Sequence, residues 1–203
     1  MMSDYKFTIE RKKQTVKTVL ELSYQHGAPN VSTNMIAQQL GITQPALYKH
    51  FKNKQEIWEE VATSIAKEIS KNIATINGEK LQANTALKRL VLSHLELLRK
   101  APALPEIMML RKKNNEHSTF QKIIQDSMKD FHSALAQEVK RAVKEGEFDC
   151  NLCAKDASSL IRGLVQSLIL RMLIERNLDI LSKNGERLLD LLLSGFTKTG
   201  KKQ

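Results

Sequence analysis

The sequence predicts an all-α fold of about nine helices, and three observations lead to this prediction. First, no stretch alternates apolar and polar residues convincingly with a period of two, as a half-buried strand would. Second, apolar residues recur every three or four positions along most of the chain. Third, only 8 of the 203 residues are Gly and 4 are Pro, so few positions interrupt a helix. Apolar residues make up 41% and charged residues 27%, values that suit a globular helical protein.

The formal charge of +10 indicates a polyanionic partner without identifying it. We expect no membrane partner, because the richest apolar run, residues 188–193, is short and is interrupted by Asp190. The N-terminus has no apolar segment of the kind found in secretion signals. The sequence therefore predicts a cytoplasmic protein.

The first helix is expected over residues 8–25. Val16, Val19, Leu20 and Tyr24 form its apolar stripe, and the helix should end at His26-Gly27.

Residues 32–51 read as two short helices joined by a tight turn. Ser32 can cap the first of them, and Gly41 stands where a left-handed residue would end it. Thr43 can cap the second, with Pro45 in its first turn, where a missing N–H is harmless. Leu47 and Phe51, four residues apart, should then pack inward. This pattern predicts a helix-turn-helix.

The second of these helices carries polar side chains that suit a DNA groove. Gln44 can pair with adenine or with phosphate, while Pro45 and Ala46 can contact a thymine methyl group. Tyr48, Lys49 and His50 are expected within reach of the DNA backbone or, for Tyr48, of a base edge. No Asp or Glu occurs between residues 30 and 55, so no carboxylate would repel phosphate there. An ordinary helical hairpin with a solvated face is the alternative, and these details argue against it.

From about Arg11 to Trp58, the chain resembles the DNA-binding domain of the tetracycline-repressor (TetR) family. Residues 41–54, Gly-Ile-Thr-Gln-Pro-Ala-Leu-Tyr-Lys-His-Phe-Lys-Asn-Lys, are similar to that family's signature. The similarity covers about a quarter of the chain. It implies a helix-turn-helix domain over residues 1–53 and a helical effector-binding and dimerisation domain over 54–203. It also implies a sequence-specific transcriptional regulator, with ligand-released repression from a palindromic operator and no cofactor.

By this resemblance, DNA contacts extend beyond the second helix. Thr33, Asn34 and Lys54 stand where family members touch the operator. Asn34 is a departure, because many relatives have Arg there and read guanine with it. The DNA-binding residues are therefore expected to be Thr33, Asn34, Thr43, Gln44, Pro45, Ala46, Tyr48, Lys49, His50 and Lys54.

The rest of the chain reads as further helices. A break is expected at residues 101–105, since neither Pro102 nor Pro105 fits a helix interior. A short helix containing Ile107 should follow, and then a polar loop over residues 112–117. The longer helices are expected at about 54–76, 83–100, 118–145, 153–176 and 184–197.

The last two expected helices are apolar on more than one face, so they must be covered on more than one face. Either they are central helices of a monomer or they meet a second copy of the chain. The resemblance implies the second, a homodimer with a four-helix interface. The expected interface residues are Leu160, Leu164, Leu168, Met172, Leu188, Leu189, Leu192 and Phe196.

A pocket for a small hydrophobic effector is expected among the helices between these two regions. His94 and His117 are its polar candidates, although a lone histidine is more often structural. The expected lining is His94, Leu95, Leu98, Met108, Met109, Phe120, Ile124, Phe131 and Leu164. For each apolar residue in this set, an ordinary core position is the competing interpretation.

Cys150 and Cys153 form a lone C-x-x-C. A zinc site would need two more ligands at suitable spacing, and no such motif is present, so we expect no metal. A thiol sensor remains an alternative to an incidental pair. The chain has no phosphate loop, nucleophile elbow or H-E-x-x-H motif, which disfavours an enzyme. The main alternative function is an architectural or protein-contacting DNA-binding dimer without an inducer.

Overall fold

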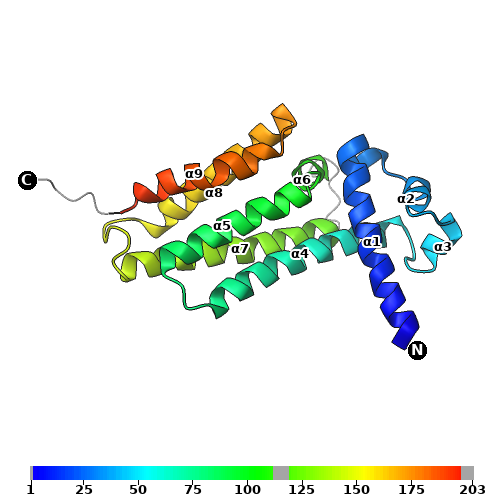
Figure 1. Cartoon of the computed structure of the whole chain (residues 1–203), viewed down its shortest axis with the longest axis horizontal. Helices are drawn as coiled ribbons and strands as arrows, with labels where there is room; N and C mark the ends of the chain where they lie inside the picture. Colours follow the sequence, from blue (N-terminus) through cyan, green and yellow to red (C-terminus); the bar gives the residue numbers. More distant parts are fainter. Residues whose placement is uncertain (1, 112–118, 198–203) are drawn as a thin grey trace, which may run out of the picture. The chain divides into compact units, whose positions relative to one another are not determined.

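A computed structural model of the chain describes residues 2–111 and 119–197, and all regular structure within those ranges is helical. The expected all-α class is therefore confirmed. In chain order (Figure 1), the helices are α1 (Met2–His26), the 3₁₀ helix η1 (Ala28–Asn30), α2 (Thr33–Gln39), α3 (Gln44–Tyr48), α4 (Lys54–Gly78), α5 (Ala83–Lys100), α6 (Leu104–Arg111), α7 (Thr119–Lys144), α8 (Ala154–Glu175) and α9 (Asp179–Ser194).

The chain forms two compact units. The first comprises Met1–Lys67 and Ala101–Asp126, and the second comprises Glu68–Lys100 and Ser127–Gln203. Helices α4 and α7 each contribute residues to both units. The functional division expected at residue 53 stays a prediction.

The helix-turn-helix forms through the local signals expected from the sequence. The Ser32 hydroxyl accepts a hydrogen bond from the Met35 N–H at 3.2 Å, and the Thr43 hydroxyl accepts one from the Ala46 N–H at 3.3 Å. Between the two helices, Gly41 adopts a left-handed φ of 65°. The side chain of Leu47 is fully buried. The predicted caps and turn are therefore confirmed.

Polar contacts tie α1 to the start of α4 inside the first unit. The ammonium group of Lys12 donates to Glu60 at 3.1 Å and lies 5.3 Å from the centre of the buried Phe51 ring. At the start of α4, the Asn53 side chain accepts from the Glu56 N–H at 2.9 Å. The Glu56 carboxylate in turn accepts from the Lys52 N–H at 2.6 Å. These bonds fix the segment that follows α3.

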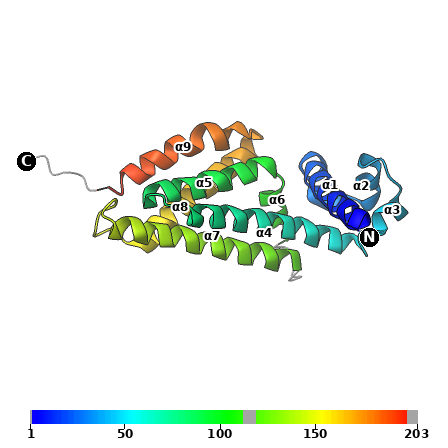
Figure 2. The same cartoon turned by 60° about the horizontal axis from the view of Figure 1, so that its bottom comes forward.

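In the second unit, α9 packs along both α5 and α8, as Figures 1 and 2 show. Gly185 allows the close approach of α9 to α5. A Cβ atom at that position would come within 2.6 Å of the Leu95 side chain, which is itself buried.

The start of α5 is capped by a side chain distant in the sequence. The two carboxylate oxygens of Glu147 accept hydrogen bonds from the backbone N–H groups of Ala83 and Asn84, at 2.8 and 3.0 Å. Arg141 donates to the Leu81 carbonyl at 2.8 Å, just before the same helix. The first N–H groups of a helix have no partner within the helix, so they and the positive end of the helix dipole both favour a carboxylate here.

Replacing Glu147 with Ala should lower the free energy of unfolding by about 1–2 kcal/mol, the usual effect of losing a side-chain cap. Chemical denaturation followed by circular dichroism would measure this loss. The control is Glu186→Ala, because Glu186 is exposed on α9. It should change stability by no more than about 0.5 kcal/mol. Equal effects of the two substitutions would contradict the assigned cap.

Two helices begin earlier than expected. Helix α1 begins at Met2 instead of residue 8. Helix α9 begins at Asp179 instead of residue 184 and ends at Ser194 instead of residue 197, and the Asn177 side chain accepts from the Asp179 N–H at 3.0 Å where the helix begins. Helix α8 ends at Glu175, within one residue of the expected end, and the next residue, Arg176, has a left-handed φ of 47°. The polar loop expected at 112–117 lies outside the described residues.

Helix α8 corrects the expectation that no segment is long and apolar enough to cross a membrane. Its 22 residues are long and apolar enough to cross a membrane, by the criterion of length and composition alone. The sequence interpretation considered only the longest uninterrupted apolar run, whereas a span depends on the average over a helix. One face of α8, including Ile161, Val165 and Leu168, is buried within the second unit. Because core helices also meet the criterion, a single such helix is weak evidence for a span.

Candidate nucleic-acid interface

Helix α3 presents a shallow hollow at its surface. Gln44, Pro45, Tyr48 and Lys49 line this hollow, and all four were expected to touch DNA. Tyr48 is 41% exposed although it is a large aromatic residue. An exposed aromatic ring beside amide and ammonium groups can offer both stacking surface and hydrogen bonds.

The other predicted DNA-binding residues differ in how accessible their side chains are. Asn34, Thr43 and Lys54 are exposed, while Ala46 and His50 are half-buried. Thr33 is only 7% exposed, and its hydroxyl is occupied within the protein. It accepts hydrogen bonds from the Gln44 amide nitrogen at 2.7 Å and from the Tyr48 hydroxyl at 3.4 Å. Thr33 therefore contacts two of the side chains that line the hollow.

Positive charge gathers around the end of α3. Desolvation lowers the pKa of His50 below its ordinary value, and the positive charges of Arg11, Lys12 and Lys49 lower it further. His50 therefore lies near three cations, two of them on α1 and the third, Lys49, directly after α3. The arrangement creates a local positive potential that attracts polyanions.

A second site of interest is a small cavity inside the second unit, with room for about one water molecule. The ring of His94 stacks on Phe131 with a centroid distance of 4.3 Å. Burial, with a smaller contribution from His132, lowers the pKa of His94 to about 4, so its imidazole is neutral at pH 7. Its Nδ1 atom is buried without a hydrogen-bond partner in the described part of the chain. The cavity is lined by Ile69, Asn72, Ile73, Leu90, Ser93, His94 and Phe131.

Of the predicted effector-pocket residues, His94 and Phe131 line this cavity. Leu95 lies against α9 at Gly185, and Leu164 lines a different hollow, described below. Leu98 is buried in the second unit, and Phe120 and Ile124 are buried in the first. Met108 is half-buried, and the side chain of Met109 lies outside the described residues. The sequence interpretation missed Asn72 and Ser93, because polar residues on apolar helices gave no signal of a cavity.

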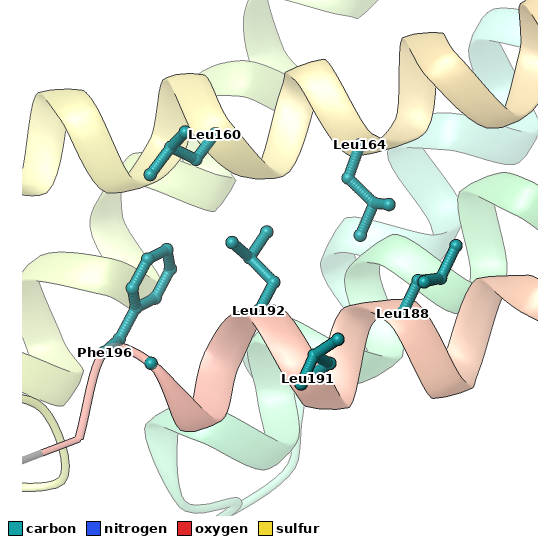
Figure 3. Close-up of a pocket in the computed structure, with 7 residues that line it drawn as sticks. Leu160, Leu164, Leu188, Leu191, Leu192 and Phe196 are labelled. Carbon is teal, nitrogen blue, oxygen red and sulfur yellow. The ribbon is translucent and has the colours of Figure 1, made fainter.

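Helices α8 and α9 form an apolar hollow on the surface of the second unit (Figure 3). It is lined by Leu160, Leu164, Leu188, Leu191, Leu192, Gly195 and Phe196. Leu160 is 55% exposed and Leu191 is 66% exposed. Farther along α8, Leu170 and Ile174 are also exposed. A row of large exposed apolar side chains marks a surface that another molecule can cover.

The predicted dimer-interface residues divide into two groups. Leu160, Leu164, Leu188, Leu192 and Phe196 line the hollow. The structure buries the other three inside the chain, and they are Leu168, Met172 and Leu189. The sequence interpretation missed Leu191, since a run with five leucines in six residues does not reveal which of them face outward.

The two cysteines lie between α7 and α8, where both are exposed and are not joined by a disulfide. Among residues 2–111 and 119–197, no group of three or more His, Cys, Asp or Glu side chains is placed to hold a metal ion.

Comparison with known families accounts for nearly the whole chain. Residues 17–61 match the family described as bacterial regulatory proteins, tetR family. Residues 59–195 match the family described as YsiA-like protein, C-terminal region. The chain belongs to the tetR family. It is a DNA-binding transcriptional regulator with a helix-turn-helix. The family resemblance found in residues 11–58 is therefore confirmed.

Among curated relatives, the class C tetracycline repressor of Escherichia coli is 36% identical over 55 residues, which cover 27% of this chain and 25% of that protein. The nucleoid occlusion factor SlmA of Glaesserella parasuis is 28% identical over 102 residues, covering 49% of each chain. The chain thus spans between a quarter and half of the length of these two relatives. SlmA of Vibrio cholerae is 22% identical over 160 residues, covering 76% of this chain and 82% of that protein.

Solved structures of transcriptional regulators share the fold across most of the chain. KstR2, a ketosteroid regulator of Mycobacterium tuberculosis, has a TM-score of 0.75 at 17% identity, covering 93% of this chain and 95% of its own. A regulator from Saccharomonospora viridis in complex with choline has a TM-score of 0.76 at 19% identity, covering 91% and 96%. FadR of Bacillus subtilis in complex with stearoyl-CoA has a TM-score of 0.69 at 21% identity, covering 90% and 98%. At these identities the likeness shows the fold alone.

Proposed function

We propose that this tetR-family regulator is a repressor that binds a palindromic operator as a homodimer and leaves it when a small hydrophobic effector binds. The surface hollow at α3 that Gln44, Pro45, Tyr48 and Lys49 line together is the observation that carries the DNA-binding part. Since the target is chromosomal DNA, the protein acts in the bacterial cytoplasm, in association with the nucleoid.

The DNA-binding residues have distinct tasks in this proposal. Gln44 reads a base edge in the major groove, and Pro45 packs on a thymine methyl group. Lys49 and Lys54 neutralise phosphates, which positions the helix without selecting a sequence. Asn34 offers a neutral amide to the DNA, so it adds no positive charge to the complex.

A second copy of the chain is the proposed partner of the α8–α9 hollow. The exposed leucines of α8 and α9 are apolar enough to pack on their own symmetry mates. A single helix-turn-helix makes few base contacts, whereas a dimer reads two half-sites about one helical turn apart.

Operator affinity should rise as pH falls, through protonation of His50. Its lowered pKa keeps the imidazole neutral at pH 7, and nearby phosphates would raise that pKa. Binding to DNA therefore takes up a proton. Operator affinity increases as the pH falls from the pKa of His50 in the bound protein to its pKa in the unbound protein. Fluorescence anisotropy from pH 8 to 5.5 measures this dependence.

The matched variants are His50→Gln, which should flatten the pH profile, and His26→Gln at an exposed position near the end of α1, which should leave it unchanged. If the His50 variant kept the wild-type pH profile, protonation of His50 would not be the source of the pH dependence of operator affinity.

The effector in this proposal is apolar with one neutral polar group. The cavity beside His94 joins apolar walls to the amide of Asn72 and the hydroxyl of Ser93, and no charged side chain lines it. Entry of a ligand must widen the cavity. The stearoyl-CoA and choline complexes show that related folds accept ligands of very different kinds.

Helix α4 is the proposed link between effector and operator, because its residues belong to both units. The effector needs only a difference in affinity between two arrangements of the helix. About 1–3 kcal/mol of coupling changes operator affinity by roughly 5- to 150-fold, and operator DNA weakens the effector by the same factor.

Similarity to nucleoid occlusion factors supports a second candidate, a DNA-binding dimer that contacts another protein and has no small-molecule inducer. Footprinting on the DNA that flanks its own coding region, followed by a screen of hydrophobic compounds for release, tests both candidates. A protected palindrome released by a compound supports the repressor. A protected site that no compound releases, together with capture of a protein partner, supports the alternative.

A further inference from the structure

Thr33 has an environment that does not suit a phosphate contact. It is the first residue of α2 and is almost fully buried. Its hydroxyl oxygen accepts hydrogen bonds from Gln44 and Tyr48, which follow it by 11 and 15 residues. The shorter bond, 2.7 Å from the Gln44 amide nitrogen, joins the starts of the two helices of the helix-turn-helix.

This bond restricts what the Gln44 amide can offer to DNA. A glutamine amide has one oxygen that accepts and two N–H groups that donate. With one N–H on Thr33, the oxygen and the second N–H remain, and they match adenine, which presents a donor at N6 and an acceptor at N7. If the amide were turned over, its oxygen would accept from the Thr33 hydroxyl. Both N–H groups would then face outward and match the two acceptors of guanine, O6 and N7.

We infer that Thr33 is a positioning residue that fixes the orientation of the Gln44 amide and so makes the operator base opposite Gln44 an adenine. This inference rests on the proposed function, in which α3 enters the major groove. Tyr48 supports the same arrangement, because its hydroxyl lies 3.4 Å from the Thr33 oxygen. Thr33 thus acts on sequence choice through Gln44.

The test begins with selection of sites from a random duplex pool by the full-length wild-type protein. The position read by Gln44 is the one that loses its preference in Gln44→Ala. Competition binding then compares the selected site with a variant in which adenine is replaced by guanine at that position. The wild type should prefer adenine by roughly 5- to 150-fold, the range for one bidentate contact.

Thr33→Val keeps the shape of the side chain and removes its hydroxyl, so the amide can turn. It should lower the adenine-to-guanine ratio by about fivefold or more, while preferences at other positions persist. Thr33→Ser keeps the hydroxyl and should retain the ratio within about twofold. Thr33→Ala removes the same hydroxyl and provides the measurement if the valine variant does not fold, which thermal unfolding would reveal.

Two results would overturn the inference: a wild-type preference for guanine at the position of Gln44, or an unchanged ratio in a folded variant without the Thr33 hydroxyl. Failure of the proposed function looks different, because the wild-type protein would then select no site at all. A purely structural role of Thr33 would weaken every site equally and leave the ratio unchanged.

Discussion

Replacing Leu191 with Glu is expected to convert the proposed homodimer into a monomer and to lower operator affinity by about 10²- to 10⁴-fold. Leu191 lines the α8–α9 hollow and is 66% exposed in the single chain. A carboxylate there costs the monomer little, since water solvates it. In a leucine-rich interface the same carboxylate would be buried without a partner, and its symmetry mate would double the penalty.

The loss of affinity follows from the loss of the second half-site. Two linked helix-turn-helix units bind with an effective concentration that a monomer does not have. Light scattering after size-exclusion chromatography measures the mass, and a gel-shift titration measures the affinity. The matched control is Ser182→Glu, which adds the same charge at an exposed position of α9 outside the hollow. A Leu191→Glu protein that stays dimeric and binds normally would contradict the proposed interface.

Removing both Lys49 and Lys54 is expected to lower operator affinity by about three orders of magnitude at 0.1 M salt. Each ammonium group that neutralises a phosphate releases condensed counterions, and a dimer would lose four such contacts. The slope of log K against log salt should become shallower by about 0.9 for each lost contact. The loss should be similar on specific and random DNA, because phosphates carry no sequence information.

Titrations between 0.05 and 0.4 M salt (roughly the range in which such slopes are measured) would test this prediction. The control replaces Lys140 and Lys155 with Ala, which removes the same charge from exposed positions of the second unit. Equal slopes for the two double variants would show that net charge, and not placement, governs binding.

Local signals were sufficient to predict the helix-turn-helix. Ser32, Gly41 and Thr43 act on residues within one turn, so their roles could be predicted from the sequence. The cap that Glu147 provides to α5 spans more than sixty residues, and no local pattern indicates it. The early start of α9 was missed for a different reason, since Asn177, whose side chain accepts from the Asp179 N–H, was not interpreted as the start of a helix.

The functional surfaces were predictable in composition but not in detail. Among the leucines on either side of Asp190, the sequence interpretation chose Leu189 for the outward face. Packing of α9 on α5 and α8 instead buries Leu189 and leaves Leu191 exposed. Thr33 was expected at the DNA, yet its hydroxyl is held by Gln44. The cavity beside His94 depends on how three helices meet, which helical periodicity alone does not indicate.

Unbiased selection from a pool of random duplex DNA at moderate ionic strength tests the central claim most directly. The proposed account predicts enrichment of a palindrome whose half-sites lie about one helical turn apart, bound by two copies of the chain. Recovery of no preferred site, or of a single site without two-fold symmetry, would contradict the claim that paired α3 helices read DNA.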